Sequence, residues 1–354
     1  MKPKFIAFYL PQYHTIPEND MWWGKGFTEW IRLKSAKPLF NNHYQPRIPY
    51  NYYDLSNVNE MVQQARLAQE YGIYGFCYYH YWFNGKLLLE TPLKNMLKNK
   101  EVDIPFCLSW ANEKWTRAWE GKSKEVLIDQ EYGGKNEWEE HFSYLLGYFK
   151  DSRYIKIDGR HVILIYRTAS FSKFDEMISF WNVKMNENGF NDLYVIETLN
   201  SFQKQPTCKY SQAVVEFEPM FTVGNNNKNI NRIKRITKKY LPFLFNKTYR
   251  LFDYDYVWKK IINRNNIYKG KKVFLGAFTD WDNSPRFGSK GAIFTNVTPE
   301  KFGYYLSIQA KRSKGEFVFI NAWNEWAEGA YLEPDKKNST KLLDEVKKIS
   351  NSIR

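Results

Sequence analysis

The chain has 354 residues, a formal net charge of +14 and 18% aromatic residues. This length exceeds that of a typical small domain and suits one large α/β barrel or two domains. The sequence contains no apolar run approaching the ~18 residues of a membrane span, which argues against a membrane-spanning protein.

The start of the chain and its cysteines indicate a cellular setting. The first expected strand, residues 5–10, follows the N-terminus almost directly, without an apolar stretch of about 7–15 residues and a small-residue cleavage site before it. We therefore expect no signal peptide. Two of the three cysteines, Cys77 and Cys107, lie inside apolar runs, where cysteine is usually buried. A reduced, cytoplasmic location is the simplest interpretation.

Segments with strand character alternate with segments of helical periodicity. The expected strands are 5–10, 73–79, 104–110, 162–166, 193–197, 213–217, 273–278 and 317–320. The expected helices are 58–72, about 89–100, about 136–150, 172–188 and a helix that starts at Pro299 after the cap Thr298. Asn57 and Glu60 resemble a capping box, and residues 11–55 show no clear period. Eight strands with helix-length connections predict one (β/α)8 TIM barrel over 1–354, with a long first loop.

A basic segment at 225–272 interrupts this pattern between the sixth and seventh strands. It holds 14 Lys/Arg against only Asp253 and Asp255. We expect an insertion within the barrel domain, usually a solvated face, with peripheral contact to an anionic membrane or charged glycan as the alternative. No zinc-finger spacing, RNA-recognition signature or Walker loop is present, so nucleic acid is not an expected partner.

The last strand ends in the pair Glu325 and Glu328, placed among tryptophans. Paired carboxyl groups are what the chemistry of glycosidic bonds requires. Two neighbouring carboxylates do not both ionise freely, so the pKa of one rises and it can donate a proton to a departing oxygen. An acidic surface turn is the alternative, and the flanking indoles of Trp323 and Trp326 disfavour it.

Polar and aromatic residues also follow six other expected strands. In a (β/α)8 barrel the active site lies at the carboxyl ends of the strands, so these residues should meet at one rim. The candidate substrate-binding residues are Tyr9, Gln12, Tyr13, His14, Glu29, Trp30, Tyr79, His80, Trp82, Trp110, Asn112, Glu113, Trp115, Arg117, Glu216, Trp281, Asp282, Arg286, Asn324 and Trp326.

Several of these residues have structural alternatives. His14 and His80 could be hydrogen-bonded structural residues, and Glu29 in the long first loop could be a surface residue. The tryptophans Trp110, Trp115 and Trp119 form either a stacking platform for sugars or loop packing. Arg117 and Arg286 either bind substrate or pair with Glu113 and Asp282.

Six segments together carry a resemblance to WbsX-type proteins, which are similar to glycoside hydrolase family 99. They are Ala7–His14, Trp22–Trp30, Tyr78–Phe83, Ser109–Arg117, Trp281–Arg286 and Trp323–Gly329. The resemblance implies a retaining glycosidase on a (β/α)8 barrel that acts on α-mannosidic bonds inside glycans. It also implies a link to surface polysaccharides such as lipopolysaccharide.

The resemblance further implies a mechanism in which the sugar's own 2-hydroxyl is the nucleophile and a 1,2-anhydro sugar is the intermediate. Carried over by position, Glu325 is the base for this hydroxyl and Glu328 the acid/base for the leaving oxygen. Ala327 stands where the hydrolases usually have histidine.

Two other functions stay open. A glycosyltransferase of surface-polysaccharide biosynthesis would use an Asp-x-Asp metal motif, which Asp280–Asp282 and Asp253–Asp255 both fit. No glycine-rich nucleotide cradle accompanies them. A non-catalytic glycan-binding protein would have no need for the glutamate pair. Because no His/Cys cluster has ligand spacing, we expect neither a metal nor a cofactor.

Overall fold

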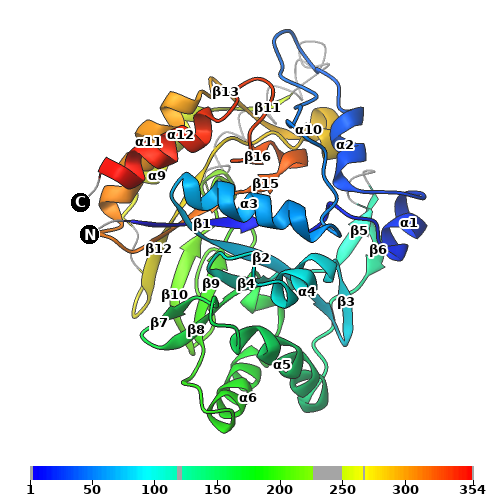
Figure 1. Ribbon diagram of the computed structural model, residues 1–354, viewed down its shortest axis with the longest axis vertical. Coiled ribbons are helices and arrows are strands. Elements are labelled where there is room, and N and C mark those ends of the chain that lie inside the picture. Colours follow the sequence, from blue (N-terminus) through cyan, green and yellow to red (C-terminus); the bar gives the residue numbers. More distant parts are fainter. Residues whose placement is uncertain (1–2, 118–121, 226–248, 266–267, 353–354) are drawn as a thin grey trace, which may run out of the picture.

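The computed structural model describes residues 3–117, 122–225, 249–265 and 268–352. Eight parallel strands form its centre (Figure 1), and each coincides with a predicted strand to within a few residues. They are β1 (Lys4–Tyr9), β2 (Ile73–Phe83), β4 (Phe106–Trp110), β8 (Arg160–Ile165), β9 (Tyr194–Leu199), β10 (Ser211–Glu216), β12 (Lys272–Phe278) and β14 (Phe317–Asn321). Because β1 pairs with both β14 and β2, the sheet closes on itself. The predicted (β/α)8 barrel is confirmed.

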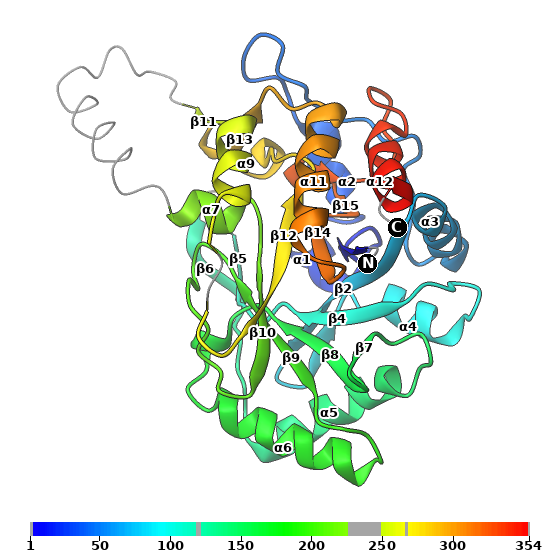
Figure 2. The same cartoon turned by 90° about the vertical axis from the view of Figure 1, so that its left-hand side faces the viewer.

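Helices connect most of the strands and cover the barrel (Figure 2), whereas β9 and β10 are joined by a loop. The main ones are α3 (Val58–Glu70), α4 (Thr91–Lys98), α5 (Lys135–Phe149), α6 (Phe174–Glu187), α7 (Met220–Asn225), α9 (Tyr254–Ile262), α11 (Pro299–Arg312) and α12 (Lys341–Ser352). Two predicted caps are present: Asn57 accepts from the Asn59 amide at 3.1 Å, and Thr298 accepts from the Lys301 amide at 3.3 Å. Each bond satisfies an N–H group that the first turn of the helix leaves without a partner.

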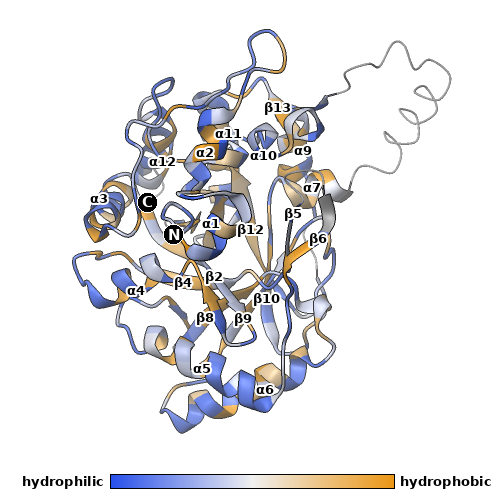
Figure 3. Cartoon of the chain, turned by 90° about the vertical axis from the view of Figure 1, so that its right-hand side faces the viewer, coloured by the Kyte–Doolittle hydropathy of each residue, from blue (hydrophilic) through white to orange (hydrophobic). Residues whose placement is uncertain are grey.

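Shorter elements lie in the connections. They are α1 (Pro17–Trp23), α2 (Glu29–Ser35), β3 (Lys86–Leu88), β5 (Trp115–Arg117), β6 (Lys122–Ile128), β7 (Lys156–Ile157), β11 (Arg250–Asp253), α10 (Ser284–Phe287), β13 (Ala292–Thr295), β15 (Asn324–Glu325) and β16 (Ala330–Tyr331). The barrel strands are buried and mostly apolar, whereas helices such as α3 and α6 alternate between apolar and polar residues (Figure 3). No helix among the described residues is long and apolar enough to cross a bilayer.

Aromatic rings fill the interior of the barrel. The ring of Phe8 lies 5.7 Å from Tyr79, 5.2 Å from Phe217 and 5.7 Å from Phe319, between ring centroids. Pairs at this separation contribute about 0.5–1.5 kcal/mol beyond the burial of their area. The barrel is therefore a packed core, and any cavity must lie above this layer, where the strands end.

The predicted basic insertion includes a helix of the barrel wall. Within 225–272, the residues 226–248 lie outside the described part of the chain, but β11 and α9 are described. Helix α9 lies beside α11 (Figure 2). It buries Tyr254, Val257, Trp258 and Ile261, and the ring of Trp258 stacks on that of Tyr305 of α11 at 5.3 Å. This helical spacing is present in the sequence, where the surrounding lysines and arginines obscure it. Contact of 225–272 with a membrane or charged glycan stays a prediction.

Glycine is required where β12 passes β10. A Cβ on Gly276 would lie 2.0 Å from the carbonyl oxygen of Glu216. Since the obstacle is backbone, Gly276→Ala should lower the free energy of unfolding by about 1–3 kcal/mol or more, measured by denaturant titration. The matched control is Gly147→Ala in α5, where the nearest atom is 3.8 Å away and alanine should stabilise the helix by about 0.5–1 kcal/mol. An unchanged Gly276→Ala protein would contradict this packing.

Candidate active site

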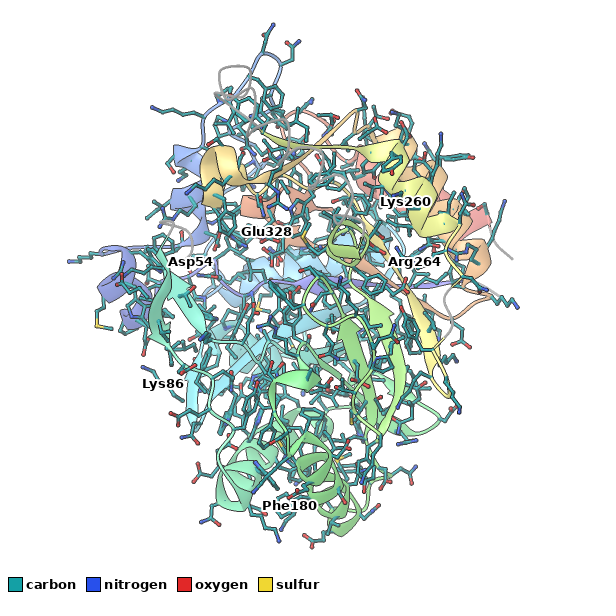
Figure 4. The ribbon with its side chains drawn as sticks, turned by 180° about the vertical axis from the view of Figure 1, so that it is seen from behind. Asp54, Lys86, Phe180, Lys260, Arg264 and Glu328 are labelled. Atoms are coloured by element: carbon teal, nitrogen blue, oxygen red, sulfur yellow. The ribbon has the colours of Figure 1, made fainter. Side chains whose placement is uncertain are left out.

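A cavity of about 480 Å³ lies at the carboxyl ends of the barrel strands. Its lining comes from segments that follow or end most of the strands, including Leu10, Tyr81, Ala111, Phe217 and Glu325. Figure 4 shows Glu328 near the middle of the molecule, above the barrel strands. Both predicted catalytic carboxyl groups thus line one cavity where barrels of this class carry their active sites.

One arginine side chain joins three carboxylates in this cavity. The Arg286 guanidinium lies 2.5 Å from Glu328 through one terminal nitrogen, and 3.2 Å from both Glu325 and Glu29 through the other. The Arg286 and Glu325 side chains are each only 9% exposed, and that of Glu29 is fully buried. A single positive charge therefore faces three acids in a poorly solvated site.

Burial raises the pKa of Glu325 to about 8, because desolvation and the neighbouring charges of Glu328 and Glu29 outweigh the opposing charge of Arg286. Burial also raises the pKa of Glu328, again against Arg286. Removing charged carboxylates from water is unfavourable, and like charges add to the effect. At neutral pH the pair therefore retains a proton, which is the condition for one carboxyl group to act as an acid.

Asn324 anchors the segment that carries the glutamates. Its side chain accepts from the Leu10 amide at 2.7 Å and donates to the Leu10 carbonyl at 3.0 Å. The Tyr13 hydroxyl donates to the Asn324 carbonyl at 2.5 Å. These bonds tie the segment after β14 to the one after β1, and they fix the backbone directly before Glu325.

Trp326 and Gly329 shape the turn between and after the two glutamates. The fully buried Trp326 indole donates to Glu333 at 2.6 Å and stacks on Tyr331 at 3.8 Å. Gly329 has φ +69°, and a Cβ there would lie 2.9 Å from the Asp282 amide nitrogen. The same amide donates to the Glu328 carbonyl at 2.6 Å. The turn is thus held from both sides.

Both aspartates of the Asp280–Asp282 motif bind side chains of the long first loop. Arg47 lies 2.8 Å from Asp280, and His43 and Gln45 lie 2.8 and 2.6 Å from Asp282. In the second Asp-x-Asp motif, Asp253 caps α9 and Asp255 pairs with Lys301 at 2.6 Å. Within the described residues, no three His, Cys, Asp or Glu side chains are grouped as metal ligands would be.

The structure brings eight predicted site residues to the cavity. They are Gln12, Tyr79, Glu113, Trp115, Trp281, Arg286, Glu325 and Glu328. Glu29 contacts this group through Arg286. Arg286 was expected to bind substrate or to pair with Asp282. It pairs with the glutamates rather than with Asp282, and its binding of substrate stays a prediction.

The other predicted residues lie away from the cavity lining. They are Tyr9, Tyr13, His14, Trp30, His80, Trp82, Trp110, Asn112, Arg117, Glu216, Asp282, Asn324 and Trp326. Most have partners in the protein. His14 bonds to the Pro11 carbonyl at 2.9 Å, Trp30 donates to the Tyr53 carbonyl, and Arg117 pairs with Glu125 at 2.5 Å. Trp119 lies outside the described residues.

The period of a β-strand explains which predicted residues miss the cavity, because successive side chains point to opposite faces. On β2, Tyr79 and Tyr81 line the cavity, whereas His80 and Trp82 face α5. There His80 bonds to His141 at 2.8 Å, and burial lowers the pKa of His80 to about 3. This pair is therefore neutral and structural.

The same alternation recurs on other strands. Tyr9 bonds to Gln64 of α3 and Glu216 to Arg264, while their neighbours Leu10 and Phe217 line the cavity. Trp110 is buried against His141 and Trp181, and its neighbour Ala111 lines the cavity. Asn112 binds the backbone of Arg167.

Sequence reasoning missed several aromatic residues of the cavity. They are Trp23, Tyr81, Tyr166, Phe202, Phe217 and Phe287. For Tyr81 the signal was available, since it lies two residues from Tyr79 on the inward face. Phe217 follows the outward-facing Glu216, so the alternation places it on the inward face. Burial, with the charges of Glu113, Glu328 and Glu325, raises the pKa of Tyr166. Phe202 lies in a loop and Phe287 ends the four-residue helix α10, so neither belongs to a segment long enough to show a period.

Comparisons with known proteins agree with the sequence motifs. A family model described as "Glycosyltransferase WbsX" matches residues 5–346. Two proteins from strains of Xanthomonas campestris pv. campestris, both described as "Uncharacterized protein WxcX", are 35% identical over 349 and 354 residues, 96% of this chain. The alignments cover 48% of those proteins, so the chain spans about half the length of these curated relatives.

Two solved structures share the fold. A "Glycoside hydrolase-like protein" has a TM-score of 0.58 and 12% identity, covering 98% of this chain and 94% of its own. A GH99 endo-alpha-mannosidase from Bacteroides thetaiotaomicron has a TM-score of 0.54 and 11% identity, covering 98% and 96%. At these identities the likeness concerns the fold alone.

The raised pKa of Glu325 predicts how stability depends on pH. The folded protein holds this proton to about pH 8, whereas the reference carboxyl group has a pKa of 4.5. The stabilising contribution is complete below about pH 4.5 and is lost as pH rises to about 8, by up to ~1.4 kcal/mol per pH unit. Glu325→Gln removes this titrating group. The free energy of unfolding of the variant, relative to that of wild type, should therefore increase as pH rises from 5 to 8.

Denaturant titrations of both proteins at several pH values measure this difference. Glu70→Gln, at an exposed ion pair with Lys347, is the matched control and should run parallel to wild type. Parallel curves for Glu325→Gln and wild type would contradict the raised pKa.

Proposed function

The chain belongs to the WbsX glycosyltransferase family, and we propose that it is a retaining glycoside hydrolase of the endo-α-mannosidase type. Its proposed substrate is a bacterial surface polysaccharide or related glycan. The observation that carries this proposal is the pair Glu325 and Glu328, held on Arg286 in a cavity with aromatic walls. Aromatic faces bind the apolar faces of sugars, and two carboxyl groups supply acid and base.

In the reactive form the proton that the pair holds lies on Glu328, and Glu325 is ionised. In the proposed first step, Glu325 takes the proton of the sugar's 2-hydroxyl while that oxygen attacks the anomeric carbon. Glu328 donates its proton to the leaving oxygen as the glycosidic bond breaks, and a 1,2-anhydro sugar forms. In the second step a water molecule opens this ring from the other face. Glu328 accepts the proton of the water, and Glu325 returns its proton to the 2-oxygen. Two inversions give net retention.

Arg286 has a part in both steps. A proton moves onto Glu325 and off Glu328 in the first step, so negative charge moves from one carboxylate to the other. Because both lie against the same guanidinium, the charge keeps a positive partner throughout. A fixed charge that needs no reorganisation is an efficient form of electrostatic stabilisation.

The second candidate is a glycosyltransferase, which the description of the family model favours. Such an enzyme would bind a nucleotide sugar, commonly with a metal on an Asp-x-Asp motif. In this chain Arg47, His43 and Gln45 already engage the carboxylates of Asp280 and Asp282. This engagement supports the hydrolase as the first candidate.

Substitution of the two glutamates should separate their roles. Glu328→Gln removes the proton donor, so it should slow cleavage of an aryl α-mannoside with a poor leaving group by about 10²–10⁴-fold and affect an activated aryl glycoside much less. Glu325→Gln removes the base and should be severe with both substrates. The measurement is kcat/KM for each variant, with Glu70→Gln as control. Folded variants with near wild-type rates would show that the pair is structural.

Metal removal should leave activity intact. Because the Asp-x-Asp carboxylates already have protein partners, turnover of a manno-oligosaccharide should be unchanged after EDTA treatment and without any nucleotide sugar. The assay compares treated protein, untreated protein and treated protein with added Mn²⁺. Loss with EDTA and recovery with Mn²⁺ would favour the glycosyltransferase.

A further inference from the structure

The loop after β9 presents an aromatic ring at the edge of the cavity. Phe202 lines the cavity, yet it is 69% exposed. Glu325, on the same lining, is only 7% exposed. A large exposed aromatic residue loses favourable burial unless something covers it. Because Phe202 lies at the edge of the cavity, we expect the ligand of the cavity to cover its ring.

The backbone around Phe202 forms a tight, hydrogen-bonded turn. The Asn200 side chain accepts from the amides of Phe202 at 2.9 Å and Gln203 at 3.1 Å, and the Asn200 amide donates to the Gln203 carbonyl at 2.9 Å. An asparagine that bonds two residues ahead stabilises such turns. The ring is therefore held by the turn, although its surface is open.

Two further contacts support this turn. Fully buried Glu197 accepts from Gln203 at 3.2 Å, and also from Thr168 and Ser211 at 2.5 Å each. On the other side, a Cβ on Gly224 of α7 would lie 2.6 Å from the Ser201 Cβ. The turn is thus packed between a buried carboxylate and a helix, which reduces the entropy that binding would otherwise cost.

A charged group lies over one face of the ring. The Arg167 guanidinium is 4.2 Å from the Phe202 ring centroid and 3.4 Å from Glu113, which also lines the cavity. Since Phe202 is largely exposed, the opposite face of its ring is open to a ligand. The Arg167 backbone is held by Asn112. An aromatic face next to hydrogen-bond donors and acceptors matches a pyranose ring, which has apolar C–H faces and hydroxyls at its edge.

We propose that Phe202, with Arg167 and Glu113 beside it, forms a sugar-binding subsite at the edge of the cavity, for a residue of the glycan chain beyond the bond that is cut. The inference rests on the proposed function and extends it. The substrate is a chain long enough to reach from the buried glutamates to an exposed ring. Phe202 thus determines preference for longer chains and does not take part in bond cleavage.

The test is binding as a function of chain length. Isothermal titration would give Kd for α-linked manno-oligosaccharides of two, four and six units, in a Glu325→Gln background that prevents turnover. Phe202→Ala should weaken binding of the longer chains by roughly tenfold and leave the disaccharide unchanged. Phe202→Trp should retain the affinity. The matched control is Tyr304→Ala, which removes another exposed aromatic residue (62%) on α11 and should have no effect.

The outcomes separate the subsite from the hydrolase proposal. A length-dependent loss in Phe202→Ala supports the subsite even if no bond is cut by the wild-type protein, in which case only the hydrolase proposal fails. Equal loss at all lengths, no loss, the same loss in Tyr304→Ala, or no binding of any probe would overturn the subsite. Hydrolysis by wild type that Phe202→Ala leaves unchanged at every length would also overturn it, while the hydrolase proposal would stand.

Discussion

A single guanidinium shared by three carboxylates, two of them buried and one partly exposed, is the constraint on which the rest of this site depends. Glu29, Glu325 and Glu328 all lie within 3.2 Å of Arg286. One positive charge does not offset three negative charges in a poorly solvated site, so the cluster is more favourable when it holds a proton. Acid and base are thereby present together at neutral pH. The site obtains its chemistry from an electrostatic imbalance that would be unfavourable anywhere else in the fold.

The surrounding structure maintains this imbalance. Asn324 joins the glutamate segment to the end of β1, and Trp326 is held by Glu333. Arg47 of the first loop pairs with Asp280, which directly precedes the segment Trp281–Arg286. Each of these groups lies outside the cavity lining, which explains why motif residues outnumber the residues that could touch a sugar. Much of the motif positions the acids.

The fold and the catalytic pair could be predicted from the sequence because their signals are local. Alternation of apolar strands and helical periods marks the barrel, and the position of Glu325 after β14 marks the rim. The three-dimensional partners could not be predicted, because Arg286 and Glu29 are about 40 and 300 residues from the pair in sequence, respectively. Arg286 meets the pair through the pairing of β12 with β14, and Glu29 through the β1–β14 pairing that closes the barrel. Whole strand ends were predicted as site residues, whereas alternation puts every second side chain, such as His80, on the helix side. Phe202 lies in a loop and gave no periodic signal.

The most direct test of the central claim is infrared detection of the shared proton. Difference spectra between pH 5 and pH 9 report protonated carboxyl groups by their carbonyl absorption, and substitution assigns it to a residue. The account predicts a protonated-carboxyl band in the wild-type protein that persists at pH 7, disappears as pH passes about 8, and is reduced in Glu325→Gln. A wild-type spectrum without this band at pH 7 would contradict it, because the pair would then carry no proton with which to act as an acid.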